Sequence, residues 1–200
     1  MFRRVRRKIA QVRLESALPG PFHHHRAIFI HIPKAAGTSV SIALFGHQVG
    51  HATIMERYAQ DYASTRDYFK FTFVRDPLAR AISAFKFLQA GGMTPRDKAY
   101  SKRLQGLTFT EFAPRLAEFQ DIEHFRPQHS FICSPYRRVL VDYVGRMESM
   151  PESFAYVTRT IGFEGELPQL NVGSKKDPVD ERTSQIVRDF YNQDCVLFDY

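Results

Sequence analysis

The sequence has few cysteines and no long apolar run. Cys133 and Cys195 are the two cysteines among 200 residues, too few and too far apart for a disulfide framework or a metal cluster, so we expect a reducing compartment. No apolar run approaches the roughly 20 residues that a transmembrane helix needs. The charged start MFRRVRRKIAQVRL has neither a continuous apolar segment nor the cleavage site of a signal peptide. These features predict a cytoplasmic protein.

Acidic residues are absent before Glu15. Without the basic residues that precede it, the formal net charge falls from +7 to +1; they are Arg3, Arg4, Arg6, Arg7, Lys8 and Arg13. The rest of the chain is nearly neutral, which argues against a broad basic face for nucleic acid. We expect a basic arm over residues 1–26, either solvated or in peripheral contact with an anionic membrane surface. A single folded domain should follow over 27–200.

The first strong pattern is that of a strand, a loop and a helix. AIFIHI, residues 27–32, has the β-branched and aromatic content of a buried strand. SVSIALFG, which ends at Gly46, predicts a short helix that Thr38 or Ser39 caps.

A second strand and helix follow. YFKFTFV, residues 68–74, has its phenylalanines on one face of a predicted strand. The next residues, RDPLARAISAFKFL, begin a helix in the expected way, with Asp76 as the N-cap and Pro77 in the first helical position.

The rest of the chain continues the alternation. The polar, glycine-flanked residues 91–106 are expected to form a mobile loop. A third strand is predicted at RVLVDYVG, residues 138–145, followed by helices over 150–161 and 180–194. Strands alternating with helices predict a three-layer α/β/α fold with a central, mainly parallel sheet, and the loops at the carboxyl ends of its strands should form the site.

The loop HIPKAAGTSV, residues 31–40, has some features of a phosphate loop. The unpaired N–H groups and the dipole of a helix N-terminus make an anion site after such a strand. The nucleotide triphosphatase pattern G-x-x-x-x-G-K-[ST] would need glycine at Ile32 and lysine at Thr38, and both are absent. Asp142 after RVLV could pass for a magnesium ligand, but a structural role is favoured. A magnesium-dependent nucleotide triphosphatase or kinase is therefore a minor alternative.

Two motifs together give the sequence a family resemblance. PKAAGTS, residues 33–39, is similar to the 5′-phosphosulfate loop of sulfotransferases that use 3′-phosphoadenosine 5′-phosphosulfate (PAPS), and FVRDPLARAISAF, residues 73–85, looks like their 3′-phosphate motif. Further similar blocks follow in order: GHAT, HFRPQHSF, DYVGRMESM, LPQLN and FYNQDCVLFDY. Over roughly residues 27–200 the chain resembles the carbohydrate sulfotransferases of the heparan sulfate 2-O and chondroitin 4-O type, which have a P-loop-like fold.

The resemblance implies how the donor would be held. The donor-binding candidates are Lys34, Ala35, Ala36, Gly37, Thr38, Ser39, Arg75, Ser83 and Lys175. The loop backbone would cradle the 5′-phosphate while Lys34 reaches the bridging oxygen, where charge appears as the S–O bond breaks. Arg75 would bind the 3′-phosphate with a bidentate fork and Ser83 with its hydroxyl. No metal is expected, since the leaving group is already a phosphate.

The acceptor hydroxyl must lose a proton as it attacks sulfur, and a histidine or carboxylate within reach could accept it. By the resemblance, His51 in GHAT matches the catalytic histidine of the heparan sulfate 2-O type, and a surface or capping histidine is the alternative. His124 and His129 in EHFRPQHSF are the other candidates for the base. His31 is expected to pack at the end of its strand.

The acceptor that the resemblance implies is a carbohydrate. Basic side chains could meet an acidic sugar chain; they are Arg126, Arg137, Arg138 and those between Arg96 and Arg103. A non-catalytic nucleotide-binding module that kept the fold is the alternative from another class. The joint presence of both phosphate motifs favours the enzyme, because a relic has no chemical reason to keep both.

Overall fold

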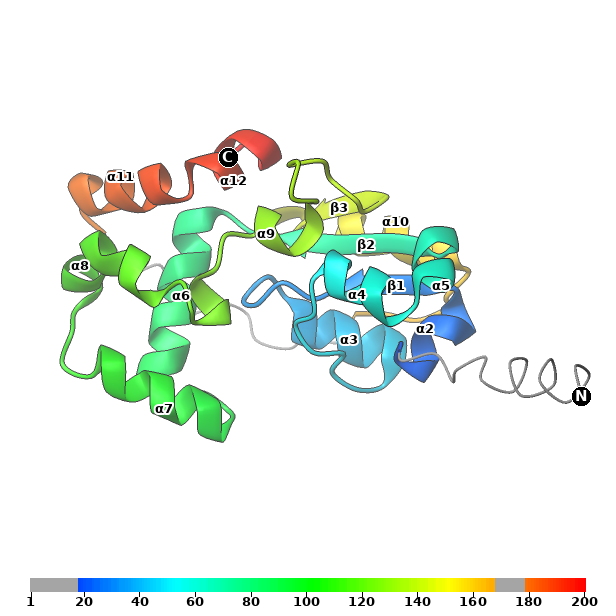
Figure 1. Ribbon diagram of the computed structural model, residues 1–200, viewed down its shortest axis with the longest axis horizontal. Coiled ribbons are helices and arrows are strands. Elements are labelled where there is room, and N and C mark those ends of the chain that lie inside the picture. Colours follow the sequence, from blue (N-terminus) through cyan, green and yellow to red (C-terminus); the bar gives the residue numbers. More distant parts are fainter. Residues whose placement is uncertain (1–17, 168–178) are drawn as a thin grey trace, which may run out of the picture.

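The computed structural model describes residues 18–167 and 179–200 (Figure 1). The described elements, in chain order, are α2 (Gly20–His25), β1 (Ala27–Ile30), α3 (Gly37–Phe45), α4 (Ile54–Gln60), α5 (Tyr62–Asp67), β2 (Phe69–Val74), α6 (Pro77–Gln89), α7 (Pro95–Leu104), α8 (Phe109–Phe112), the 3₁₀ helices η1 (Ala113–Phe119) and η2 (Glu123–Phe125), α9 (His129–Ile132), β3 (Tyr143–Arg146), the 3₁₀ helix η3 (Met147–Ser149), α10 (Met150–Ile161), α11 (Glu181–Phe190) and α12 (Asn192–Phe198). Lys175 lies outside the described residues.

The folded part of the chain begins earlier than the sequence suggested. Residues 18–26, placed in the basic arm from the sequence, include α2, and Leu18 and Phe22 are buried in the core. The first 17 residues of that arm lie outside the described part of the chain. Within the two described ranges, no helix has the length and apolar character needed to cross a membrane.

The centre of the fold is a three-stranded parallel sheet in the order β1-β2-β3. Phe71 in the middle strand lies opposite Phe29 on one side and Tyr143 on the other. Every residue of β1 is buried, as expected for a parallel strand between layers of helices. The predicted α/β fold with a central parallel sheet is confirmed, and the carboxyl ends of its strands meet at one edge.

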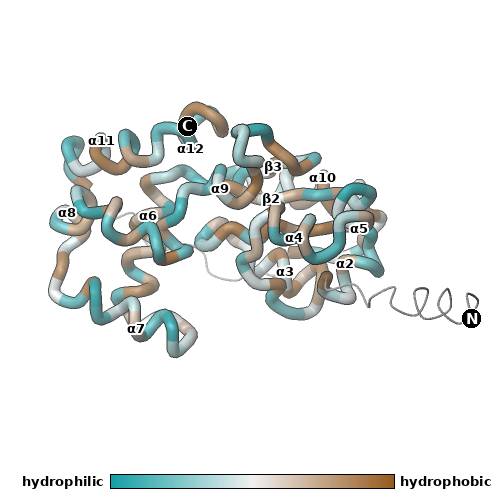
Figure 2. Tube along the Cα trace, in the orientation of Figure 1, coloured by the Kyte–Doolittle hydropathy of each residue, from teal (hydrophilic) through white to brown (hydrophobic). Residues whose placement is uncertain are grey.

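Helices make up the other half of the molecule. Figure 1 shows α6, α7, α8 and α11 grouped beside the half that contains the sheet. One cluster of buried side chains surrounds the sheet, and a second joins α6 to α8, η1 and α11. In Figure 2 the tube of α11 alternates between hydrophilic and hydrophobic residues, as expected of a helix with one buried face.

Helix α6 connects the two halves, and it begins as predicted. The Asp76 side chain accepts a hydrogen bond from the Ala79 N–H at 2.8 Å, and Pro77 occupies the first helical position. Ala81, Phe85 and Leu88 are buried in the second cluster. The opposite face of α6 is thus free to point toward the loop after β1.

The segment 91–106 is a helix and a turn, so the prediction of a mobile loop was wrong. Thr94 and Asp97 form a capping box, in which each side chain accepts a hydrogen bond from the backbone N–H of the other. Pro95 adds a preset φ at the first helical position, and Leu104 anchors the far end in the second cluster. Local capping therefore outweighs the polar composition that indicated a loop.

Two other elements differ from the prediction and one agrees with it. The third strand covers only Tyr143–Arg146. Just before it, the Asp142 carboxylate pairs with the buried Lys70 ammonium at 2.9 Å and accepts a hydrogen bond from the Lys70 backbone N–H at 2.8 Å, which gives Asp142 a structural role. The predicted final helix is two helices that meet at Tyr191. The helix over 150–161 is confirmed.

Candidate active site

The loop after β1 bends through two left-handed residues. Lys34 has φ 67° and Ala36 has φ 61°, a region that side chains other than glycine rarely adopt. The second bend makes Ala36 the N-cap of α3, without any side-chain hydrogen bond to the helix. Capping by Thr38 or Ser39 was therefore predicted wrongly, since both lie in the first turn. A helix N-terminus without a side-chain cap is the geometry of an anion site.

Gly37 is required by the close approach of His31. A Cβ atom at position 37 would lie 1.8 Å from Cδ2 and 2.0 Å from Nε2 of the His31 ring. That ring is 3% exposed and stacks on Phe29 with centroids 5.6 Å apart, which confirms His31 as a packing residue at the strand end. The buried His31 ring thus packs directly against the loop after β1.

Lys34 lies at the bend of the loop with its ammonium group over an aromatic ring. Its Nζ is 3.9 Å from the centroid of Phe87, which α6 supplies. Burial, together with the nearby positive charge of Arg75, lowers the pKa of Lys34 to about 8, although Asp97 opposes the shift. With this lowered pKa, Lys34 loses its proton more readily than an exposed lysine does, and a nearby anion would raise the pKa again.

Arg75 stands at the carboxyl end of β2, beside the same loop. Its Nη1 donates to the Lys34 carbonyl at 3.4 Å, and burial lowers the pKa of its guanidinium. Among residues 18–167 and 179–200, no carboxylate lies within salt-bridge distance of it. The neighbouring Asp76 caps α6 and pairs with Arg188 at 3.2 Å instead. The guanidinium is therefore available to an anionic ligand.

Ser83 lies on the face of α6 that also carries Phe87. The two are four residues apart and thus neighbours on one side of the helix. Since Phe87 contacts Lys34, this face turns toward the phosphate loop. Lys34, Arg75 and the N-terminus of α3 thus lie together at the edge of the sheet, and Ser83 shares a face of α6 with Phe87.

Three histidine rings lie next to this region. The ring centroid of His51 is 4.2 Å from that of His31 and 6.0 Å from that of His124, and His124 is 5.3 Å from Phe87. His51 Nδ1 lies 3.0 Å from the His31 carbonyl oxygen. A carbonyl can only accept, so Nδ1 is the nitrogen that carries the hydrogen in the neutral form of the His51 ring, and Nε2 is the nitrogen without one.

The other two histidines considered for the base differ from His51. Burial lowers the pKa of His124 to about 4, so its ring is neutral near neutral pH. His129 lies on α9, and its Nδ1 is 2.6 Å from a carboxylate oxygen of the fully buried Asp194. The structure thus brings His51 and His124 together beside Lys34 and gives His129 a partner on α12.

Three residues of this region were missed from the sequence: Phe87, Asp97 and Gln128. Phe87 could have been found from its spacing of four from Ser83. Asp97 was assigned to a loop, whereas in the capping box its carboxylate acts electrostatically on Lys34 and His124. Gln128 had no local signal, because its contact with Arg75 joins residues far apart in the chain.

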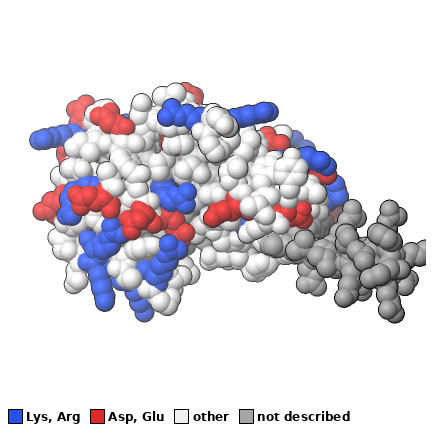
Figure 3. Space-filling model, viewed as in Figure 1, with Lys and Arg blue, Asp and Glu red and all other residues white. Residues whose placement is uncertain are grey.

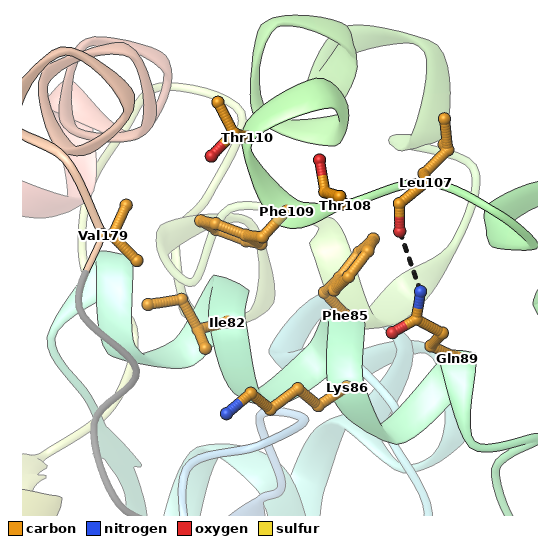
Figure 4. A pocket seen from close by; sticks show the side chains of 9 residues that line it. All are labelled: Ile82, Phe85, Lys86, Gln89, Leu107, Thr108, Phe109, Thr110 and Val179. Carbon is orange, nitrogen blue, oxygen red and sulfur yellow. Dashed lines mark hydrogen bonds between the residues drawn. The ribbon is translucent and has the colours of Figure 1, made fainter.

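A pocket of about 330 Å³ lies apart from these groups, between α6 and the chain around α8 (Figure 4). Ile82, Phe85 and Phe109 face one another across it, and Gln89 closes one side by donating to the Leu107 carbonyl at 2.8 Å. None of the candidate site residues lines it. Within the described residues, no group of three or more His, Cys, Asp or Glu side chains is arranged to hold a metal ion.

A parallel sheet with an uncapped helix N-terminus and an arginine at its edge is an arrangement typical of α/β proteins that bind phosphate groups. The chain belongs to the sulfotransferase family, whose model matches residues 22–200. It is similar to carbohydrate sulfotransferase 14 of Danio rerio, with 28% identity over 116 residues that cover 48% of this chain. The alignment covers 31% of that relative, so the match spans less than a third of its length. No solved structure matches the chain.

Proposed function

We propose that the protein transfers a sulfuryl group from PAPS to a hydroxyl group of a carbohydrate. The observation that carries this proposal is the convergence of Lys34, Arg75 and the N-terminus of α3 on one loop, with the His51 ring beside it. Family membership and the similarity to a carbohydrate sulfotransferase support it.

Lys34 and the loop backbone bind the 5′-phosphosulfate end of the donor. The first N–H groups of α3 bind the 5′-phosphate, and Lys34 leaves the Phe87 ring to contact the bridging oxygen. As the S–O bond to this oxygen breaks, the lysine stabilises the negative charge left on the phosphate. The sulfur forms its new bond to the acceptor oxygen in line with the leaving oxygen, and adenosine 3′,5′-bisphosphate is released.

Arg75 and Ser83 bind the 3′-phosphate. The guanidinium offers a planar pair of N–H donors that fits two phosphate oxygens, and Ser83 adds a hydroxyl from α6. The spacing of Ser83, four residues from Phe87, and the lack of any described carboxylate within salt-bridge distance of Arg75 support this assignment.

His51 accepts the proton of the acceptor hydroxyl. Its Nδ1 is held by the His31 carbonyl, so Nε2 has the free lone pair that a general base needs. The neighbouring His124 has a pKa of about 4, and an uncharged neighbour does not oppose the positive charge that His51 gains.

The acceptor approaches beside α7. Figure 3 shows Lys and Arg side chains gathered at the lower left of the view, where Figure 1 places α7. The exposed basic residues of this helix are Arg96, Lys98, Lys102 and Arg103. Arg103 pairs with Asp121 at 2.6 Å, whereas Lys98 and Lys102 lie four residues apart on the exposed surface. The buried Asp97 of the same helix acts electrostatically on Lys34 and His124, which supports an acceptor path along α7.

The first prediction tests the donor. Adenosine 3′,5′-bisphosphate should raise the thermal unfolding midpoint, because a ligand at about 100 times its Kd stabilises the folded state by about 2.7 kcal/mol. The matched measurement uses ATP with magnesium at the same concentration. A shift with magnesium ATP alone would identify a nucleotide triphosphatase and refute the proposal. A shift with the bisphosphate but no transfer to any carbohydrate would indicate a non-catalytic binding module.

The second prediction follows from the pKa of Lys34. At about pH 8 the free protein has this lysine half deprotonated, and a bound phosphate raises its pKa, so binding takes up close to half a proton. At about pH 6 the lysine is already charged and takes up no proton, and the phosphate groups, whose second pKa is about 6, release protons on binding instead. Affinity should accordingly fall as the pH rises above about 8. Calorimetric titration in buffers of different ionisation enthalpy measures the uptake.

The control for this measurement is Lys34→Arg, which stays charged across this range. It should bind the bisphosphate without proton uptake at either pH. An uptake in the arginine variant equal to that of the original protein would mean that another group titrates.

A further inference from the structure

Gln128 holds the backbone of Arg75 with both ends of its side-chain amide. Its Oε1 accepts from the Arg75 N–H at 3.0 Å, and its Nε2 donates to the Arg75 carbonyl at 2.8 Å. The residue is 0% exposed. Arg75 directly follows the last residue of β2, so the amide continues the hydrogen bonding of the strand by one residue. The point from which the arginine side chain starts is thereby fixed.

Gln128 is itself held by Asp194 of the C-terminal helix α12. The Gln128 N–H donates to Asp194 Oδ2 at 2.7 Å, and Oδ1 accepts from the His129 N–H at 2.9 Å and pairs with His129 Nδ1 at 2.6 Å. Asp194 is 0% exposed, so these donors replace all of the water around a buried carboxylate. A carboxylate with three such partners is rigidly oriented.

The residue after Arg75 is fixed as well. The Asp76 N–H donates to Glu148 Oε1 at 2.8 Å, and the Asp76 carboxylate caps α6 and pairs with Arg188. The backbone on both sides of the Arg75 side chain is therefore held by buried or paired groups. Its guanidinium, in contrast, has only the long 3.4 Å contact to the Lys34 carbonyl among the described residues.

We infer that Gln128, held by Asp194, is a positioning residue that aims Arg75 at the 3′-phosphate and so sets the preference for 3′-phosphorylated nucleotides. A bidentate fork requires its two N–H groups to be placed within a fraction of an ångström, and the chain of contacts from α12 supplies that placement. Gln128 acts through Arg75 and does not itself touch the nucleotide. The inference rests on the proposed function, because it takes the 3′-phosphate as the ligand of Arg75.

The test compares two nucleotides that differ by the 3′-phosphate. Affinities for adenosine 3′,5′-bisphosphate and adenosine 5′-monophosphate are measured by calorimetry in the original protein and in Gln128→Met, which keeps the side-chain length but has no amide. The bisphosphate should bind at least tenfold more tightly than the monophosphate in the original protein. In Gln128→Met this ratio should fall about fivefold or more, while monophosphate affinity stays within about twofold.

Two controls separate positioning from general damage to the fold. Ser130→Ala removes a hydrogen bond of 2.6 Å in the same turn, to the Pro127 carbonyl, and should leave the ratio unchanged. In an Arg75→Ala background, which loses the preference by itself, Gln128→Met should have no further effect on the ratio. If Gln128→Met does not fold, Gln128→Glu serves instead, because it keeps the acceptor for the Arg75 N–H and loses the donor to the carbonyl.

Each outcome has a definite meaning. An unchanged ratio in the Gln128 variant, or an equal loss of affinity for both nucleotides, overturns the positioning role while the donor assignment stands. A further loss of the ratio in the Arg75→Ala background shows that Gln128 does not act through the arginine. Equal affinities for the two nucleotides in the original protein overturn the assignment of Arg75 to a 3′-phosphate, and the inference with it.

Discussion

Replacing Lys34 by alanine is expected to lower turnover on the order of 10²- to 10³-fold, with a much smaller loss of affinity for adenosine 3′,5′-bisphosphate. The reason is that Lys34 neutralises the negative charge that develops on the bridging oxygen as the S–O bond breaks, whereas the bound product is also held by the loop and by Arg75. Single-turnover rates and calorimetric affinities, measured on the same variant, separate the two effects.

Arg159→Ala is the matched control for this change. It removes one exposed positive charge from α10, outside the candidate site, and should leave both rate and affinity unchanged. Equal losses of rate and affinity in Lys34→Ala would mean that the lysine binds donor and transition state alike. The assignment of Lys34 to the bridging oxygen would then be wrong.

Replacing His51 by alanine should lower turnover on the order of 10²-fold or more while the bisphosphate affinity stays within a few-fold. A base contacts the acceptor hydroxyl and not the nucleotide, so donor binding should survive. The acidic limb of the pH–rate profile should disappear, because the group that must be unprotonated has been removed. The assay starts from a panel of uronic-acid and amino-sugar oligosaccharides, among which a working acceptor is found.

His51→Asn gives a sharper version of this test. Its side-chain amide can still donate to the His31 carbonyl, as Nδ1 of the histidine does, but it offers no basic nitrogen. It should therefore lose turnover as fully as the alanine variant. His124→Ala and His129→Ala should keep the acidic limb. Near-normal turnover in His51→Ala, together with its loss in His129→Ala, would move the base to the segment around α9.

The sequence predicted those parts of the fold whose signals are local. Asp76 as the N-cap and Pro77 at the first helical position predict the start of α6. The apolar content of β1 and β2 predicts buried strands. Helix α7 was also encoded locally, in Thr94 and Asp97, but its glycines and charges were given more weight than its capping box. The start of α3 was misplaced, because a left-handed alanine at the N-cap has no sequence signature.

The candidate site was predictable only in its motif residues. Lys34, Gly37, Arg75 and Ser83 were found because their spacing resembles that of a known family. Two other features depend on contacts between distant parts of the chain. The His31 ring fills the space beside Gly37, and the Gln128 amide forms hydrogen bonds with the Arg75 backbone. Burial likewise decides the pKa of His124 and of Lys34, and no local pattern of residues reports it.

The two left-handed residues of the loop after β1 bear on the thermodynamics of ligand binding. For side chains other than glycine this conformation costs roughly 1–2 kcal/mol per residue, which neighbouring contacts must offset. Here the packing of the buried His31 ring against Gly37 holds the loop in this conformation. The loop is thus preorganised, and the conformational entropy of ordering it is lost on folding. An anion that enters it binds without having to supply that free energy again.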